Sequence, residues 1–394
     1  MRISDYQYAD IIHRCFRCGY CKFPADWSDV TNCPAYARHR MESWSSGGRL
    51  WLIRAWVTGE IEWSPYLAEI VYACTACRNC VEKCPLPIAD NIVNMVVAAR
   101  SEMVERGLLP PAVRDVLTRV QQRGNPFGLP AKKRGEWAED LRVEKFSGQD
   151  YLLYIGADGS YDSRAQQAAT ALVRLLEKAG VSFGILGKNE PDDGNDVAFM
   201  GEEGLADYLM EQTIARFREL GVKQVITLSP HALYAFTAQY PRLGGDFQAY
   251  HYTQVLSGQL RTGALPTPQS GGLRVTYHDP CFLGRWSNEY KAPRKVLGAI
   301  GGLQLAEMER NRKSSLCCGG GSGNCYTDLL GGSEESPARI RIRQAAETGA
   351  GILATACPNC LVLLEDAVRA EGLDDKLDVR DICEVFCQAS GIPL

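Results

Sequence analysis

Between residues 151 and 356, short apolar runs alternate with amphipathic stretches, and this alternation predicts strands followed by helices. Residues 151–155 form an apolar run of strand length, and residues 165–179 then repeat apolar side chains at helical spacing. Strands that alternate with helices are typical of parallel sheets covered by helices on both faces. The expected strands are 151–155, 181–186, 224–229, 274–278, 303–308 and 351–356, and the expected helices are 165–179, 204–220, 293–300 and 338–348.

The first 108 residues have a different, helical pattern. Residues 44–72 place Leu50, Ile53 and Val57 on one helical face, and another amphipathic helix begins after Pro87. Residues 108–141 are rich in proline, glycine and charge, which predicts an extended connector with one short helix. We therefore expect an α+β multidomain protein with a helical domain at 1–108, a connector at 109–150 and two α/β units at 151–268 and 269–394.

The two α/β units read as a duplication. Cys281 aligns with Ala157, Cys317-Cys318 with Asp192-Asp193, and Cys357 and Cys360 with Ser229 and Ala232, at nearly constant offsets along the chain. The first unit keeps the scaffold without a thiol at these positions, and the second unit keeps all five.

Composition and charge narrow the function classes. The chain has 394 residues, 45% of them hydrophobic, with 43 Lys and Arg against 47 Asp and Glu. This balance gives no electrostatic reason to bind nucleic acid. The longest apolar helical stretch, near residues 92–99, is far shorter than the roughly 18 residues of a membrane span. With no signal-peptide pattern at the start, we expect a cytoplasmic protein whose membrane association runs through a partner.

Eight of the 16 cysteines form two runs near the N-terminus. The runs are Cys15-x2-Cys18-x2-Cys21 with a later Cys33-Pro34, and Cys74-x2-Cys77-x2-Cys80-x3-Cys84-Pro85. The second run matches the bacterial ferredoxin pattern, in which the cysteine before proline ligates the neighbouring cluster. The alternative is structural zinc, although zinc ribbons present pairs of thiols rather than triplets. We assign Cys15, Cys18, Cys21 and Cys84 to cluster I, and Cys33, Cys74, Cys77 and Cys80 to cluster II, each a [4Fe–4S] cubane.

Five further cysteines follow strands of the second unit. Ligands of parallel sheets gather at the carboxyl ends of strands, so Cys281, Cys317-Cys318 and Cys357/Cys360 are expected to converge. Five thiolates exceed the four that zinc takes, which favours a multi-iron centre. The glycines at 319–321 and 323 indicate backbone that approaches this centre closely. A phosphate loop is the alternative, but its Lys-Ser/Thr is missing.

Two further residues, His278 and Cys325, each have two interpretations. His278 could hydrogen-bond a cluster sulfide or supply a proton, or it could be a histidine satisfied within a turn. Cys325 could line the site or fill the core, and Cys383 and Cys387 are expected to pack in the core.

The motifs His278-Asp279-Pro280-Cys281, Cys317-Cys318-Gly319-Gly320-Gly321 and Ala356-Cys357-Pro358-Asn359-Cys360 resemble one complete copy of the CCG cysteine-rich domain. Together with the ferredoxin runs, the chain resembles the HdrD type of heterodisulfide reductase, equivalent to fused HdrC and HdrB subunits. That family also includes the iron–sulfur subunits of glycolate and lactate oxidases, DsrK-type subunits and the BamD-type subunit of class II benzoyl-CoA reductase. The resemblance implies a noncubane [4Fe–4S] cluster on Cys281, Cys317, Cys318, Cys357 and Cys360, and no second one in the thiol-free unit.

Three functions remain open at this stage. The first is an electron-transfer subunit of a multi-subunit oxidoreductase, which links two cubanes and one noncubane cluster with a flavoprotein, an iron–sulfur protein or a membrane cytochrome. The second is a catalytic disulfide or persulfide reductase, with His278 as the candidate catalytic residue. The third is a ferredoxin-like module with a structural zinc in the CCG site. The absence of a flavin or nucleotide motif favours the first.

Overall fold

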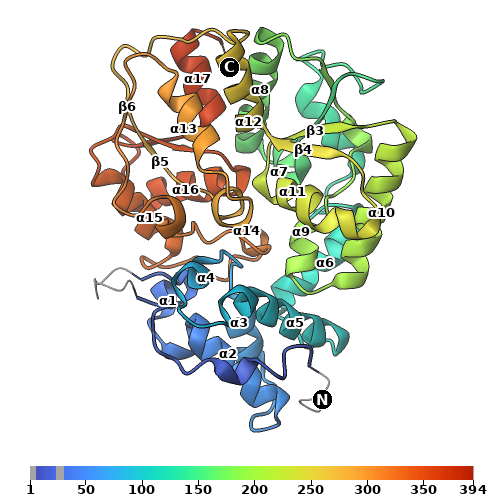
Figure 1. Ribbon diagram of the computed structural model, residues 1–394, viewed down its shortest axis with the longest axis vertical. Helices are drawn as coiled ribbons and strands as arrows, with labels where there is room; N and C mark the ends of the chain where they lie inside the picture. The colour runs from blue at the N-terminus through green and yellow to red at the C-terminus, as the bar shows by residue number, and fades with distance from the viewer. Residues whose placement is uncertain (1–5, 24–30, 394) are drawn as a thin grey trace.

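The computed structural model describes residues 6–23 and 31–393. Two α/β units lie side by side above a helical N-terminal region (Figure 1). The predicted fold class is confirmed.

The N-terminal region consists of short helices joined by cysteine-bearing loops. Ser64 accepts a hydrogen bond from the backbone of Leu67, and Pro65 occupies the first helical position, so a new helix begins there. Residues 44–72, expected as one helical segment, are therefore divided into two main helices. The helices are η2 (Ile12–Arg14), α1 (Pro34–His39), η3 (Glu42–Trp44), α2 (Ser46–Val57), α3 (Pro65–Tyr72), α4 (Asn79–Lys83), η4 (Ala89–Asn91) and α5 (Ile92–Glu105).

The connector is more ordered than an extended segment. Helix α6 (Pro111–Arg123) runs for 13 residues because Val113, Val116 and Val120 give it a buried face, and η5 (Ala131–Ala138) follows. Between them, the fully buried Asn125 side chain donates to the carbonyl oxygens of Arg123 and Leu129 at 3.0 and 2.8 Å. These hydrogen bonds satisfy backbone carbonyl groups of the turn, which has no regular secondary structure.

Each α/β unit contains one four-stranded parallel sheet. The first has the order β2-β1-β3-β4 and the second the matching order β6-β5-β7-β8, which confirms the duplication. The strands are β1 (Tyr151–Tyr154), β2 (Phe183–Gly184), β3 (Gln224–Thr227), β4 (Gln248–His251), β5 (Arg274–Tyr277), β6 (Gln304–Leu305), β7 (Ile352–Thr355) and β8 (Asp378–Asp381). The edge strands β4 and β8 were not predicted, because their polar sequences lack an apolar run.

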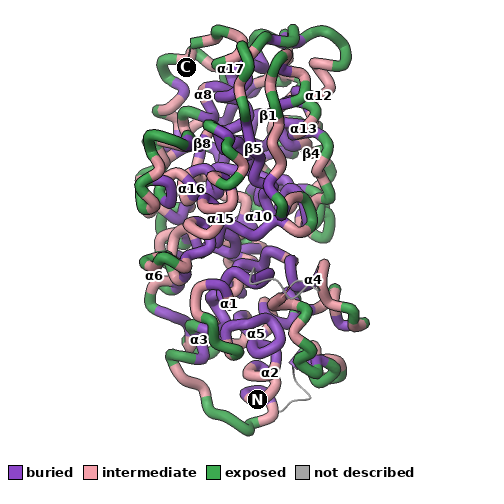
Figure 2. Tube along the Cα trace, turned by 90° about the vertical axis from the view of Figure 1, so that its left-hand side faces the viewer, coloured by how far each residue is buried: buried purple, intermediate pink, exposed green. Residues whose placement is uncertain are grey.

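The helices of the two units enclose a shared core. Strand residues from both sheets, including Leu153, Ile226, Val275 and Ala354, belong to one buried apolar cluster, and Figure 2 shows this buried interior along the length of the molecule. The first unit has α7 (Gly156–Tyr161), α8 (Ser163–Lys178), η6 (Gly187–Asn189), α9 (Asn195–Phe199), α10 (Glu203–Glu219), α11 (Pro230–Tyr234), η7 (Ala235–Gln239), η8 (Tyr240–Leu243) and α12 (Tyr252–Thr262). The second has η9 (Phe282–Trp286), α13 (Lys291–Gly298), η10 (Arg312–Ser314), α14 (Asn324–Thr327), α15 (Pro337–Ala346), α16 (Pro358–Glu371) and α17 (Ile382–Ser390).

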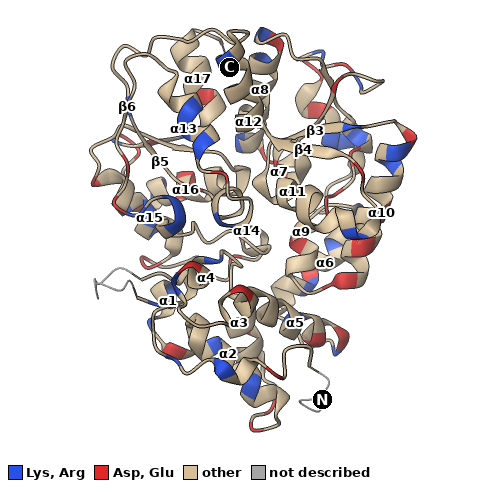
Figure 3. Cartoon of the chain, in the orientation of Figure 1, with Lys and Arg blue, Asp and Glu red and all other residues tan. Residues whose placement is uncertain are grey.

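Charged side chains of both signs lie on the helices of all three regions (Figure 3). No helix in the described part of the chain is long and apolar enough to cross a membrane.

Candidate iron–sulfur centres

The four thiols predicted for cluster I come from two loops. Cys15, Cys18 and Cys21 follow η2, and Cys84 ends α4. Burial raises the pKa of the Cys15 thiol, and the neighbouring Cys84 and Cys18 thiols raise it further. Cys18 is exposed to solvent, whereas Cys15 is buried. The two loops thus bring Cys84 near Cys15 and Cys18. Burial raises the pKa of Cys21, and Cys80 and Cys33, which the prediction assigns to cluster II, add to that shift.

The four thiols predicted for cluster II also lie together. Cys33 precedes α1, Cys74 and Cys77 follow α3, and Cys80 lies in α4. Burial raises the pKa of Cys80, and the thiols of Cys77, Cys74 and Cys33 add to that shift. The loop around this group includes Ala76 and Arg78 in the left-handed region, at φ of 50° and 59°. This backbone conformation is uncommon for residues with a side chain.

The eight N-terminal thiols of the described structure are not gathered at the spacing of a single zinc site. The sulfur ligands of tetrahedral zinc lie roughly 3.8 Å apart, since Zn–S bonds are about 2.3 Å long. Among the described residues, one set of three potential ligand atoms lies within 4.8 Å, and it contains His278, Cys318 and Cys360 but none of the eight N-terminal cysteines. A Cβ added at Gly47 would lie 3.6 and 3.7 Å from the sulfurs of Cys21 and Cys15, so the backbone of α2 packs directly against these two thiols.

The five CCG thiols converge at the carboxyl ends of β5 and β7. The sulfur of Cys317 lies 3.9 Å from that of Cys281, and the sulfur of Cys318 lies 3.3 Å from that of Cys360. The backbone N–H of Gly319 donates to Cys317 Sγ at 3.4 Å. All five cysteines are buried, and Cys357 and Cys360 stand at the start of α16. The sequence-predicted set is thus one connected group of thiols.

The thiol of Cys357 is acidified by its neighbours. Burial raises its pKa, but hydrogen bonds with Cys360 and His231 and the charge of His231 outweigh burial and lower the pKa to about 5. His231 comes from the thiol-free first unit, and its Nδ1 lies 3.1 Å from Asp196 Oδ1. A thiolate is the form that binds metal, so this environment suits a ligand.

The glycine-rich loop is also shaped by neighbouring chain segments. A Cβ at Gly321 would lie 2.4 Å from the carbonyl oxygen of Thr75, and one at Gly323 would lie 1.7 Å from Met200 Cε. These glycines let the loop pack against the cluster II loop and against the first unit. Sequence reasoning assigned them to the iron centre alone.

Two side chains next to Cys281 join the N-terminal region to the second unit. Arg285 donates from Nε to the carbonyl oxygen of Cys77 and from Nη1 to that of Ser315 at 2.8 Å. The indole of Trp286 donates to the carbonyl oxygen of Ala76 at 2.7 Å. The thiol of Cys317 lies close enough to that of Cys77 to raise the Cys77 pKa. The thiols predicted for cluster II and those of the CCG site therefore adjoin one another.

A second arginine, Arg100 in α5, bonds to three parts of the chain. It is fully buried, and it donates to the carbonyl oxygens of Cys74 and Phe199, both at 2.6 Å, and to the hydroxyl of Ser322. The sequence offered no signal for these arginines, because each contact is distant along the chain.

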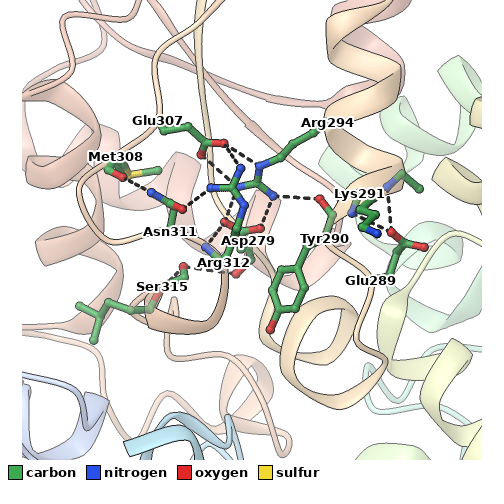
Figure 4. Close-up of polar contacts among 12 residues, drawn as sticks. Asp279, Glu289, Tyr290, Lys291, Arg294, Glu307, Met308, Asn311, Arg312 and Ser315 are labelled. Carbon is green, nitrogen blue, oxygen red and sulfur yellow. Dashed lines mark hydrogen bonds and ion pairs between the residues drawn. The ribbon is translucent and has the colours of Figure 1, made fainter.

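An ion-pair network fixes the loop before Cys281 (Figure 4). Arg294 donates to both carboxylate oxygens of Asp279 at 2.7 and 2.9 Å and to both of Glu307 at 2.6 and 2.9 Å. The backbone N–H of Arg312 donates to Asp279 Oδ2 at 2.7 Å. Because Asp279 precedes Cys281 by two residues and Arg312 precedes Cys317 by five, the network sets the spacing of two thiol-bearing loops.

His278 lies beside the thiols and is neutral at neutral pH. Its Nδ1 accepts a hydrogen bond from Arg341 Nε at 3.1 Å. Burial and the Arg341 charge lower the pKa of the imidazole well below its usual value. Burial lowers the pKa of Arg341 to about 9, so the guanidinium keeps its charge at neutral pH. A ring held neutral in this way is a poor proton donor, which weakens the acid role considered for it.

The equivalent site of the first unit contains carboxylates instead of thiols. Ala157, Asp192, Asp193 and Ser229 line one cavity of about 30 Å³, while Ala232 is buried. Burial raises the pKa of Asp193 to about 8, and Asp192 adds to the shift. With no thiol among its lining residues, this site does not fit an iron–sulfur cluster.

Of the three remaining cysteines, Cys325 lies beside the CCG thiols, where burial raises its pKa and the Cys318 and Cys357 thiols add to the shift. Cys325 accepts a hydrogen bond from Asn359 Nδ2 at 3.2 Å. Cys383 and Cys387 are fully buried in the core shared by the two sheets.

Family models agree with this division of the chain. A model described as a cysteine-rich domain matches residues 158–237 and 275–365, once in each α/β unit. A model described as a 4Fe-4S dicluster domain matches residues 11–88. The duplication and the iron–sulfur character of the N-terminal region are thereby confirmed.

Several curated proteins are similar to the chain over most of its length. The probable iron-sulfur-binding oxidoreductase FadF of Bacillus subtilis is 34% identical over 82% of this chain, and the EtfAB:quinone oxidoreductase of Syntrophomonas wolfei is 31% identical over 98%. The chain spans only 46% and 60% of the lengths of these two proteins. The HdrD-type polypeptide of the dihydromethanophenazine:CoB–CoM heterodisulfide reductase of Methanosarcina barkeri is 30% identical over 96% of this chain and 94% of its own length.

One solved structure, a hypothetical protein from Helicobacter pylori, shares the fold. Its TM-score is 0.54 at 12% identity, with 89% of this chain and 68% of the other covered.

Proposed function

The chain belongs to the HdrD-type family of heterodisulfide reductase iron–sulfur proteins, and from this premise we propose that it carries electrons through three iron–sulfur centres within a larger oxidoreductase. Cluster I would be held by Cys15, Cys18, Cys21 and Cys84, and cluster II by Cys33, Cys74, Cys77 and Cys80. A noncubane [4Fe–4S] cluster would be held by Cys281, Cys317, Cys318, Cys357 and Cys360. Bound clusters of this kind accept and release single electrons.

The contact between Cys77 and Cys317 carries this proposal. One thiol belongs to the proposed cluster II and the other to the proposed noncubane cluster, and they lie close enough for Cys317 to raise the pKa of Cys77. Arg285 and Trp286 hold the two loops together through the carbonyl oxygens of Cys77 and Ala76. These residues keep the two proposed electron-carrying sites adjacent.

In this proposal, the electron path reaches the protein surface at cluster I. Cys18 is the one exposed thiol among the described cysteines, and Phe16 and Tyr20 beside it are 65% and 45% exposed. Arg14 and Arg17 are exposed and form no ion pair with any described residue. A basic and aromatic face suits an acidic redox partner, because opposite charges steer the encounter. The partner would be a flavoprotein, an iron–sulfur protein or a membrane cytochrome, and any membrane association would run through it.

This role is that of DsrK-type and BamD-type redox subunits rather than of a reductase with two CCG clusters. The first unit offers Asp192, Asp193 and Ser229 where thiols would be needed. A substrate held between two noncubane clusters is therefore not part of the proposal.

Metal content and spectroscopy test the proposal on protein prepared without oxygen. Three clusters predict about twelve irons per chain and little zinc, at four irons per cluster. About eight irons with one zinc would instead support a structural zinc in the CCG site, which the spacing of His278, Cys318 and Cys360 within 4.8 Å also allows. Colourless protein without acid-labile sulfide would refute both versions.

A disulfide or persulfide reductase is the second candidate, and one cavity favours it. A pocket of about 260 Å³ extends from Cys318 and Gly319 between Pro337 and Leu363 and could admit a small substrate. If the isolated protein reduces a small disulfide with a chemical reductant, the catalytic alternative replaces the carrier role. If the isolated protein does not reduce the disulfide but all three centres are reduced rapidly, the result supports the electron-carrier role.

A further inference from the structure

A buried histidine lies beside the CCG thiols, and a buried arginine bonds to it. His278 directly follows β5, Arg341 lies in α15, and both side chains are 0% exposed. Arg341 Nε donates to His278 Nδ1 at 3.1 Å. Within residues 6–23 and 31–393, His278 Nε2 has no hydrogen-bond partner. A ring nitrogen of His278 and the sulfurs of Cys318 and Cys360 lie within 4.8 Å of one another.

The bond from Arg341 decides which nitrogen of the imidazole carries the proton. A guanidinium has only N–H donors and no acceptor, so the His278 Nδ1 that it contacts must be the accepting nitrogen. The ring proton of the neutral imidazole then sits on Nε2. Arg341 is itself anchored through a bond from Nη1 to Gln344 Oε1 at 2.9 Å.

The resulting N–H needs an acceptor. A buried donor without a partner destabilises a protein, and the sulfurs of Cys318 and Cys360 lie within 4.8 Å of a ring nitrogen of His278. The same geometry opposes a role for His278 as a metal ligand. Binding through Nε2 would move the proton to Nδ1, where it would face the Nε–H of Arg341.

We infer that Arg341 is a positioning residue that holds His278 as a neutral hydrogen-bond donor, and that the His278 Nε2–H bonds to a sulfur of the centre at Cys318 and Cys360 and raises its reduction potential. This inference rests on the proposed noncubane cluster. Hydrogen bonds to cluster sulfurs set reduction potentials because the donor's partial positive charge stabilises the added electron.

The test is a redox titration of the oxygen-free protein, followed by electron paramagnetic resonance. His278→Phe removes the donor, and Arg341→Met frees the ring to move its proton to Nδ1. Each variant is expected to lower the midpoint potential of the noncubane signal by about 59 mV, a tenfold change in the ratio of reduced to oxidised centre for one electron. The cubane potentials should stay unchanged. Arg341→Lys keeps a pure donor at Nδ1 and should restore most of the wild-type value.

The outcomes separate this inference from the proposed function. If the wild-type protein lacks the third signal and contains about eight irons, the proposed cluster fails and the inference fails with it. If the signal is present and both His278→Phe and Arg341→Met leave its potential unchanged, only the inference is refuted. A shift in His278→Phe without one in Arg341→Met would refute the role of Arg341. If Arg341→Met does not assemble the centre, Arg341→Lys decides: a potential lowered as far as that of His278→Phe refutes the role of Arg341.

Discussion

The thiol of Cys77 in the N-terminal region lies close enough to the thiol of Cys317 in the second α/β unit for Cys317 to raise its pKa, although the whole first unit separates the two residues in the sequence. Arg285 makes this contact possible, because it donates to the carbonyl oxygens of Cys77 and Ser315 from one buried guanidinium. The junction between the two cysteine-bearing regions is thus built from few side chains, and each can be tested.

Arg285→Met is expected to destabilise this junction. The substitution leaves two buried carbonyl oxygens without donors, at about 1–3 kcal/mol for each unsatisfied group. We expect a loss of about 2–6 kcal/mol in the free energy of unfolding and slower electron exchange between the proposed cluster II and the noncubane centre. Urea unfolding and freeze-quench spectroscopy measure the two effects. Arg261→Met, at an exposed position near the end of α12, is the matched control, and equal behaviour of both variants would contradict the role of Arg285.

Cys318→Ser is expected to remove the noncubane signal and leave both cubane signals intact. Serine cannot replace a buried thiolate that lies 3.3 Å from Cys360 Sγ, whereas the cubane ligands lie in other loops. Electron paramagnetic resonance and an iron count about four lower than wild type check this. Cys387→Ser, in the shared core, changes a thiol without changing a predicted ligand and should keep all three signals. Unchanged spectra for Cys318→Ser would disprove the ligand assignment.

The double variant Arg14→Glu/Arg17→Glu should change which small oxidants react fastest with the reduced protein. The wild-type face around Cys18 is basic, so an anionic tris(oxalato)cobaltate(III) should react faster than a cationic hexaamminecobalt(III). Charge reversal should change the ratio of the two rates on the order of tenfold at low ionic strength and less at high salt. Stopped-flow absorbance gives both rates. The control variant Arg261→Glu should keep the wild-type ratio of the two rates. If Arg14→Glu/Arg17→Glu also keeps the wild-type ratio, electrons leave the protein at another surface.

Asp381 predicts a pH dependence of stability. It is buried, accepts a hydrogen bond from Tyr252 at 2.8 Å, and burial raises its pKa from 3.8 to about 7. The folded protein therefore holds a proton that the unfolded chain releases above about pH 4, and stability falls as the pH rises through about 7. Between about pH 6 and 8 the free energy of unfolding should drop about 1 kcal/mol from this group.

Asp381→Asn keeps an amide oxygen to cap α17 and removes the titration. Chemical unfolding at several pH values should show a flatter profile for this variant than for wild type. Parallel profiles would mean that Asp381 is charged in the folded protein across this range.

The sequence predicted most of the elements, because its signals are local. Periodicity located the inner strands β1, β3, β5 and β7, and cysteine spacing separated the two thiol groups. It missed β4 and β8, whose sequences are polar because they lie at sheet edges. It also missed Arg100, Arg285 and Arg341, because a buried arginine is recognised by its carbonyl and imidazole partners, and these lie on distant parts of the chain.

The thiol-free unit places His231 against Cys357 and Met200 against Gly323. The unit without thiols therefore lines part of the thiol group of the other unit. A change at His231 or Met200 is thus expected to disturb the second unit as well as the first, which ties the two copies together although only one of them carries the cysteines.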